Sequence, residues 1–173
     1  KRLQVPDDYF TLSQAVQYQL FDLKNYYTGL FTFGDGKANN LNYTISLTRN
    51  NTYTNPIFPI GGSTFTLSGK FTLPYSLITG EDFSNMDQNP LYQLASGEPD
   101  TQKIDQAKFL WLEFYKIKFN GTWYTKIIDK LILKTQTDFG FIGAYNTDRG
   151  NIPFERFYLG GDGMNNQWSM DGR

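Results

Sequence analysis

The chain has 173 residues and a formal net charge of −1, so nothing indicates a nucleic-acid partner. It contains no cysteine, which excludes disulfides and cysteine-based zinc sites, and no histidine, which excludes a histidine-dependent catalytic triad. No run of apolar residues is long enough for a membrane-spanning helix. We therefore expect a non-enzymatic protein with no catalytic residues, no metal and no cofactor.

Apolar and polar residues alternate with a period of two along the first half of the chain, which predicts β-strands. The alternation covers residues 10–20, 41–47 and 65–73, and a weaker strand is predicted over residues 26–33. Each stretch places aliphatic and aromatic side chains on one face and mainly Thr, Ser, Asn or Gln on the other. Many Thr, Tyr, Phe and Ile residues suit a pleated surface.

Turn-forming residues separate these stretches. Residues 20–26 and 34–36 are predicted to form short connections, and Pro59, Gly61 and Gly62 are predicted to form another.

The second half of the chain continues the alternation. Strands are predicted over residues 111–124 and 131–141, joined by a tight turn at residues 128–130. Residues 78–107 form a long acidic connection, and residues 146–173 form a long glycine-rich one. Short turns on one rim and long loops on the other are typical of outer-membrane β-barrels.

Two architectures share this alternation, namely a soluble β-sandwich or lipocalin-like barrel and a transmembrane β-barrel. Three observations favour the transmembrane barrel. The predicted strands span roughly 9–16 residues, whereas soluble strands usually have about 5–6. Aromatic residues gather near the strand ends, as in an interfacial girdle: Tyr9, Phe10, Tyr26, Tyr27, Tyr53, Phe58, Trp111, Tyr115, Trp123 and Tyr124. The polar face carries charges in mid-strand, which suits a wet lumen: Lys70, Lys116, Lys118, Lys134 and Asp138.

Six strands are too few to close such a barrel, since bacterial outer-membrane barrels have about 8 strands or more. The fold class expected is therefore all-β, with an antiparallel transmembrane barrel segment over residues 1–173. Both ends are expected to continue into a longer chain.

Three stretches carry a resemblance to a known family. Residues 153–164 read P-F-E-R-F-Y-L-G-G-D-G-M, and this resembles the start of the sixth extracellular loop in the BamA family of outer-membrane assembly factors, where the loop folds back into the barrel. Residues 2–10 and 58–73 are similar to the form of this family in Bacteroidota, the latter to its F-P-x-x-G periplasmic turn and the following strand. The resemblance covers nearly the whole chain in the right order.

The resemblance implies a parent barrel of about 16 strands, of which this chain holds about six. Residues 78–107 then form a long extracellular loop, residues 146–173 begin the inward-folding loop, and Pro59, Gly61 and Gly62 form a periplasmic turn. The family's V-R-G-F-type loop tip, its POTRA repeats and its lateral seam are absent, so no activity is expected of this chain alone.

The implied function is insertion of other barrel proteins into the bacterial outer membrane, without nucleotide or covalent chemistry. The implied partners are outer-membrane lipids, nascent outer-membrane proteins and assembly-machinery lipoproteins, with no nucleic acid. Glu155 and Arg156 are expected to pair with lumen charges, and Gly160 and Gly161 to permit a tight backbone path. The inward-loop motif comprises Pro153, Phe154, Glu155, Arg156, Phe157, Tyr158, Gly160 and Gly161.

Other functions stay open. A TamA-like or secretion barrel, or a porin, would share the alternation, although a porin would lack the segment that begins at Pro153. A soluble β-sandwich could bind carbohydrate through Trp111 and Trp123. An enzyme using Glu113 with Asp138 is the weakest alternative, because nothing in the sequence brings the two carboxylates together.

Overall fold

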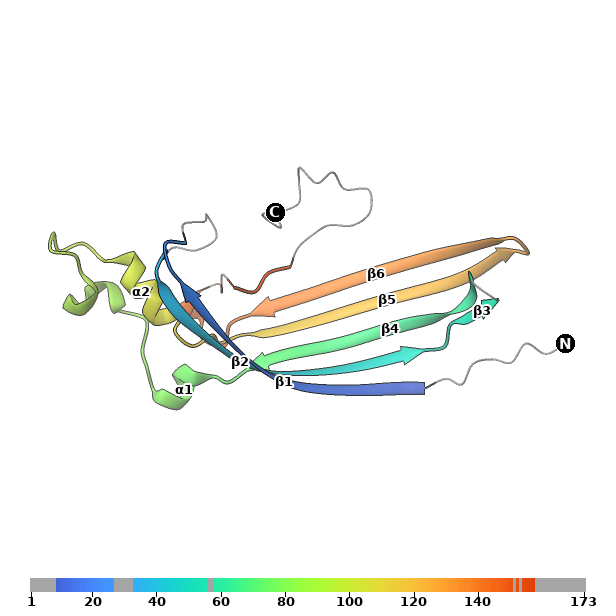
Figure 1. Ribbon diagram of the computed structural model, residues 1–173, viewed down its shortest axis with the longest axis horizontal. Helices are drawn as coiled ribbons and strands as arrows, with labels where there is room; N and C mark the ends of the chain where they lie inside the picture. The colour runs from blue at the N-terminus through green and yellow to red at the C-terminus, as the bar shows by residue number, and fades with distance from the viewer. Residues whose placement is uncertain (1–8, 27–32, 56–57, 151, 153, 158–173) are drawn as a thin grey trace.

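A computed structural model describes residues 9–26, 33–55, 58–150, 152 and 154–157. This part of the chain forms one antiparallel sheet with strand order β1-β2-β4-β5-β6, and a short strand β3 pairs with β4 (Figure 1). The strands are β1 (Tyr9–Leu23), β2 (Gly36–Asn50), β3 (Tyr53–Asn55), β4 (Phe58–Thr72), β5 (Tyr115–Ile128) and β6 (Leu131–Gly143).

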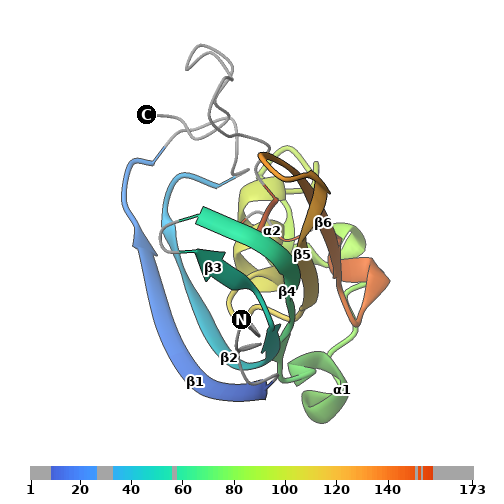
Figure 2. The same ribbon diagram turned by 90° about the vertical axis from the view of Figure 1, so that its right-hand side faces the viewer.

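The five main strands are long, with 13 to 15 residues each. They confirm the predicted all-β, antiparallel class and the predicted strand length. The sheet is curved, and β1 and β6 lie at two separate edges when the molecule is viewed from its end (Figure 2). The described sheet does not close into a barrel.

The register brings the alternation of all five long strands into phase. Reading across the sheet from β1 to β6, one row consists of Leu12, Leu47, Leu67, Phe119 and Phe139. Because successive side chains of a strand point to opposite faces, every second row lies on this same face. We call it the apolar face.

The adjacent row lies on the opposite face and consists of Ser13, Ser46, Ser68, Lys118 and Gly140. Hydroxyl, amide and charged side chains continue along this face, which we call the polar face. A shift of one residue in any pairing would mix the two faces. The in-phase register therefore indicates two different environments on the two sides of the sheet.

The connections at the two ends of the sheet differ in length. Residues 24–35 and 73–114 connect strands at one end, whereas residues 129–130 make a tight turn at the other. The predicted acidic connection over residues 78–107 contains short helices. These are α1 (Tyr75–Thr79), two 3-10 helices at Met86–Gln88 and Pro90–Tyr92, and α2 (Thr101–Lys108), with a third 3-10 helix at Thr147–Arg149.

The short connection predicted over residues 20–26 is wrong, and most of the strand predicted over residues 26–33 lies outside the described residues. Strand β1 continues to Leu23 and pairs directly with β2 along its whole length, so no strand lies between them. Tyr26 and Phe33 lie outside the strands, and residues 27–32 lie outside the described part. Phe33 instead packs in a hydrophobic core, which explains the apolar residue there.

The turn predicted at Pro59, Gly61 and Gly62 is also wrong, because all three residues lie in β4. Gly62 has a φ of 92°, and a side chain on it would collide with the backbone at Asn51 and Thr52. This glycine serves close backbone approach rather than a turn.

The strand predicted from residue 111 begins four residues later, at Tyr115. The reason is a separate pairing: Leu112 donates its backbone N–H to the carbonyl oxygen of Asn39, at 2.9 Å, and Trp111 forms an isolated bridge with the same residue. Residues 110–112 thus close the end of the sheet instead of extending β5.

The hydrophobic core lies at the end of the sheet with the long connections. One cluster contains Phe33, Ala38, Phe109, Leu112, Phe114 and Ile152, and a second contains Phe83, Met86 and Ile104. No helix in the described residues is long and apolar enough to cross a membrane.

Candidate functional site

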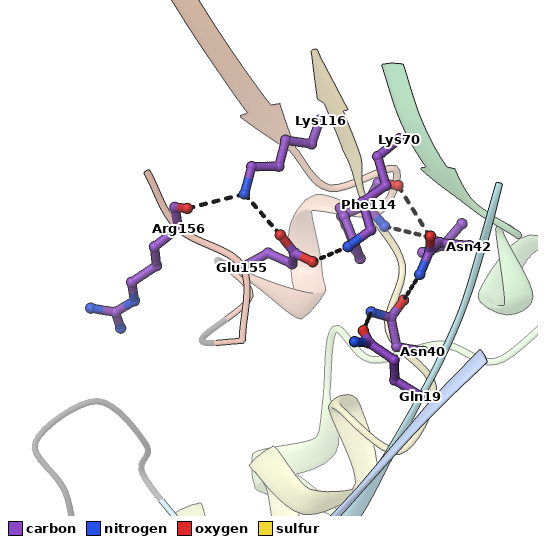
Figure 3. Close-up of polar contacts among 9 residues, drawn as sticks. Gln19, Asn40, Asn42, Lys70, Phe114, Lys116, Glu155 and Arg156 are labelled. Atoms are coloured by element: carbon purple, nitrogen blue, oxygen red, sulfur yellow. Dashed lines mark hydrogen bonds and ion pairs between the residues drawn. The ribbon is translucent and has the colours of Figure 1, made fainter. Parts of the chain in front are cut away.

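Lys116 of β5 is the centre of a polar cluster where the chain after β6 returns to the polar face (Figure 3). Its ammonium lies 2.8 Å from Oε2 of Glu155 and donates to the backbone carbonyl of Arg156 at 3.0 Å. It also lies 4.8 Å from the ring centre of Phe157. Only 7% of Lys116 is exposed, so these three consecutive residues replace the water that a buried ammonium loses.

Glu155 joins two strands by bridging Lys70 of β4 and Lys116 of β5 (Figure 3). The two lysines are direct cross-strand partners, and like charges in such positions destabilise a sheet. The carboxylate between them removes that repulsion. Burial raises the pKa of Glu155, but hydrogen bonds and the charges of both lysines outweigh it and hold the pKa below its ordinary value.

Phe157 occupies the space above Gly140 of β6. A β-carbon on Gly140 would overlap the Phe157 ring, so glycine at this position leaves room for the aromatic side chain. The ammonium of Lys118 lies 5.8 Å from the same ring centre. Cation–π contacts of this kind add stabilisation when the ring is partly desolvated.

Phe154 attaches the returning segment to the hydrophobic core. Its ring centre lies 4.8 Å from that of Phe21 and 6.3 Å from that of Phe33. Residues 154–157 therefore contact the sheet in three ways. Phe154 packs against the core, Glu155 pairs with two lysines, and the Phe157 ring packs over Gly140. We call these four residues the docked segment.

A row of buried amides lies beside the lysines on the polar face (Figure 3). Asn40 donates from Nδ2 to Oε1 of Gln19 at 3.1 Å, and Asn42 donates to Oδ1 of Asn40 at 3.3 Å. Both asparagines are at most 1% exposed. Buried amides that bond one another fix the register of β1 and β2 beneath the docked segment.

A second ion pair fixes the chain just before the docked segment. Arg149 contacts Oε1 of Glu113 at 2.6 Å, with side-chain exposures of 5% and 0%. The Arg149 guanidinium also donates to the carbonyl oxygen of Trp111 at 2.7 Å, and the hydroxyl of Ser76 donates to Glu113 at 2.8 Å. This pair ties the β4–β5 connection to the chain that leaves β6.

The structure brings together Glu155, Lys70 and Lys116 from the predicted site, with Phe157 beside Lys118. Arg156 contributes its backbone carbonyl to the cluster, and its side chain is exposed. Lys134 is exposed and pairs in register with Tyr124, eight residues along β6 from the row of Lys116. Four predicted residues lie outside the described residues: Pro153, Tyr158, Gly160 and Gly161.

Asp138 accepts hydrogen bonds from the side-chain amides of Asn120 and Gln136 and is exposed. Glu113 instead pairs with Arg149, so the structure does not bring Glu113 and Asp138 together as an acid–base pair. Among the described residues, no three acidic side chains gather as metal ligands would.

The sequence did not point to Gly140, Asn40, Asn42 or Arg149 as site residues. A glycine on the polar face of an otherwise regular strand was the available signal for Gly140. Nothing in the sequence pairs Arg149 with Glu113, because the contact joins two long connections. The arrangement as a whole offers charge pairing and docking of a connection onto the sheet.

Comparison with protein-family models, with curated proteins and with solved structures finds no match to this chain.

Proposed function

We propose that this chain is part of an outer-membrane β-barrel whose apolar face contacts lipid and whose polar face lines the lumen. The in-phase register carries the proposal, because it gives one sheet a continuous apolar face and a continuous polar face. The apolar face is exposed over β1 and β6, with exposures of 74% for Val16 and 66% for Phe141. A contiguous exposed apolar surface of this kind marks a membrane or protein contact.

The length of the uncharged stretch supports a bilayer as the contact. On the apolar face of β2, the charged residues Lys37 and Arg49 flank a stretch that carries Asn39, Leu41, Tyr43, Ile45 and Leu47. The two charges are twelve residues apart along the strand, which is roughly 40 Å at about 3.4 Å per residue. A tilt of about 45° reduces this to roughly 28 Å across the membrane, close to the hydrocarbon thickness of about 30 Å.

A soluble β-sandwich would place a second sheet about 10 Å from the apolar face. The helices and the docked segment contact the sheet at one end and on its polar face. In the described residues, the apolar side chains on this face of β1 and β6 keep large exposed fractions instead of packing under a second layer. This distribution favours lipid over a second sheet.

We further propose that the parent barrel inserts other barrel proteins into the outer membrane, as the resemblance to the BamA family implies. The docked segment supports this reading, because it lies on the polar face at the position where the family's inward loop would return. Insertion then proceeds by pairing of an incoming strand with a sheet edge, which satisfies backbone groups that lipid cannot. Lipids, nascent outer-membrane proteins and assembly lipoproteins are the partners.

The membrane assignment is tested with single cysteines in a cysteine-free background of the full-length protein; the 173 residues of this chain contain none. In the full-length protein reconstituted in vesicles, Leu47→Cys and Leu67→Cys should be quenched, when dye-labelled, by brominated acyl chains. The matched controls Ser46→Cys and Ser68→Cys lie one residue away on the polar face and should react with a water-soluble maleimide without such quenching. Equal quenching or equal labelling of both pairs would contradict the assignment.

The insertion activity is tested separately. Vesicles that contain the full-length protein should fold a urea-denatured outer-membrane barrel faster than empty vesicles do. A porin or another transport barrel would conduct small solutes and leave that folding rate unchanged, which would overturn the insertion proposal while leaving the membrane assignment intact.

A further inference from the structure

Arg49 is a cation within the aromatic part of the apolar face. It lies on β2 between Phe10 of β1 and Phe65 of β4, which are its direct cross-strand neighbours. Since β2 has a partner strand on both sides, the sheet around Arg49 is complete in the described structure. The position of this guanidinium on the apolar face is therefore a property of the interior of the sheet and not of an edge.

The two phenylalanine rings contact each other beside the Arg49 side chain. Their ring centres lie 6.3 Å apart, with an edge-to-face angle of 68°, and the Arg49 guanidinium carbon lies 5.9 Å from the Phe10 ring centre. The aromatic row continues at 6.3 Å from Phe65 to Phe119 and at 6.4 Å from Phe119 to Phe139. It thus crosses from β1 to β6 as a continuous strip.

A charge on the lipid-facing side of a strand is costly at the middle of a bilayer and nearly neutral at its interface. Arginine at the interface extends its apolar stem along the hydrocarbon and keeps its guanidinium in the headgroups. Its planar fork of donors fits two oxygens of a phosphate, which a lysine ammonium cannot do. Aromatic rings beside it occupy the same depth, where amphipathic girdles form.

We propose that Arg49, with Phe10 and Phe65, forms a binding site for the phosphate of a membrane phospholipid at the short-connection end of the apolar face. This inference rests on the proposed membrane location and adds to it a specific ligand group and a depth. The phosphate oxygens accept from the guanidinium, the phenyl rings contact the first methylenes of the acyl chains, and the site sets the level of the barrel in the bilayer.

The site is tested by solid-state NMR on the full-length protein, with 15N-labelled arginine and isotope-labelled leucine, in phosphatidylcholine vesicles. The Arg49 guanidinium signal is identified as the one that Arg49→Lys removes. We expect it to lose intensity through dipolar coupling to lipid 31P, while Leu47 shows contacts to acyl-chain protons and no coupling to 31P. A second sample, in maltoside micelles with inorganic phosphate and frozen so that tumbling does not average the coupling, should show no coupling.

Three outcomes overturn the proposal in distinguishable ways. Contact of Leu47 with acyl chains but no 31P coupling at Arg49 removes the phosphate site and leaves the membrane location standing. Absence of any lipid contact at Leu47 removes both. Equal coupling to inorganic phosphate in micelles means a general anion site rather than a lipid site.

A stability measurement gives an independent readout. Transfer from maltoside micelles to phosphatidylcholine vesicles should raise the melting temperature less for Arg49→Leu than for the unchanged protein. Lys126→Leu, which removes an exposed lysine from β5 close to the β5–β6 turn, should keep the full increase. An undiminished increase for Arg49→Leu contradicts a role of the guanidinium in lipid binding.

Discussion

The ring of Phe157 lies where a β-carbon on Gly140 would stand. Gly140 belongs to β6 and Phe157 to the docked segment, so one missing side chain on the sheet receives one aromatic side chain from a connection. The pair aligns the docked segment with the charged cluster, since the ammonium of Lys116 lies 4.8 Å from the same ring centre.

Gly140→Ala should displace the Phe157 ring and loosen the docked segment. Overpacking of this kind costs about 1–3 kcal/mol. The expected readout is faster labelling of a cysteine in a Phe154→Cys background, where the side chain is half-buried, relative to the same cysteine with Gly140 intact.

The control for this change is Gly121→Ala, on β5. A β-carbon there would meet the rings of Trp123 and Phe119 on the apolar face, so it strains the sheet without touching the docked segment. Phe157→Ala combined with Gly140→Ala should relieve the overlap and restore the melting temperature lost in Gly140→Ala. If Gly121→Ala exposes the docked segment equally, the overlap between the Gly140→Ala side chain and the Phe157 ring is not the cause of the exposure.

Lys116→Met should release the docked segment, because it leaves Glu155 with only one of its two lysines. Removing one partner from a largely buried ion pair costs about 3–5 kcal/mol, and the partial exposure of Glu155 places the effect at the lower end. The free energy of unfolding of Lys116→Met, Glu155→Gln and the double variant gives the coupling, expected to be about 1–3 kcal/mol.

Lys118→Met is the matched control, since this lysine lies near the Phe157 ring, whereas Lys70 and Lys116 form the ion pairs with Glu155. It should change stability by less than Lys116→Met. Equal losses for the two lysines would show that general positive charge on the polar face, rather than the Glu155 bridge, holds the segment.

Acidification should release the docked segment through Glu155. Its pKa is lower in the folded protein than the ordinary value of 4.5, so its contribution to stability is complete above that value and is lost as the pH falls through the depressed folded pKa. Labelling of Phe154→Cys by a pyridyl disulfide during short acid pulses, each ended by return to neutral pH, should increase only below about pH 4.5. In Glu155→Gln this increase should be absent, and an increase between pH 6 and 8 would point to a different group.

The alternation of residues predicted the strands well because it is a local property of the chain. Period-two patterns located β1, β2, β4, β5 and β6, since each strand separates an apolar from a polar face, although β2 begins five residues and β4 seven residues before the predicted stretches. Phe33 shows where the alternation misleads. This apolar residue lies outside the strands and packs in a core with Phe109, Leu112 and Phe114, so its apolar character reflects the core and not a strand.

The sequence predicted those site residues that are charged and that the alternation places on the polar face. Lys70 and Lys116 stand on the polar face by alternation alone, and Glu155 was expected to pair with charges there. The packing of Phe157 on Gly140 and the Arg149–Glu113 ion pair depend on how connections far apart in sequence fold over the sheet. A single sequence carries no local signal for contacts of that range.

Arg149→Met should destabilise the end of the sheet with the long connections. It would leave the Glu113 carboxylate buried at 0% exposure, with Ser76 as its remaining hydrogen-bond donor. The expected loss is about 3–5 kcal/mol in the free energy of unfolding. Adding Glu113→Gln should recover part of this loss, because the uncompensated charge is then gone.

Lys126→Met, which breaks the exposed ion pair with Asp129, is the control and should have no measurable effect on the free energy of unfolding. If the double variant is no more stable than Arg149→Met, the buried charge is not what the arginine compensates.

Tyr43→Phe should distinguish lipid from water on the apolar face. Tyr43 donates its hydroxyl to Oε1 of Gln14 at 2.8 Å, and both residues lie on that face between apolar rows. In water, the freed amide would bind solvent, so the change would be close to neutral. In lipid, it keeps an unsatisfied carbonyl, which costs about 1–2 kcal/mol. We therefore expect Tyr43→Phe to lower the stability of the reconstituted full-length protein, and Gln14→Leu combined with it to restore that stability. The matched control lies on the polar face, where Thr48 and Thr66 form a hydroxyl–hydroxyl contact of 3.0 Å. Water can replace that contact, so Thr48→Val, alone or with Thr66→Val, should have little effect. If Tyr43→Phe is as neutral as Thr48→Val, the apolar face lies in water or against another protein, and the proposed membrane location is wrong.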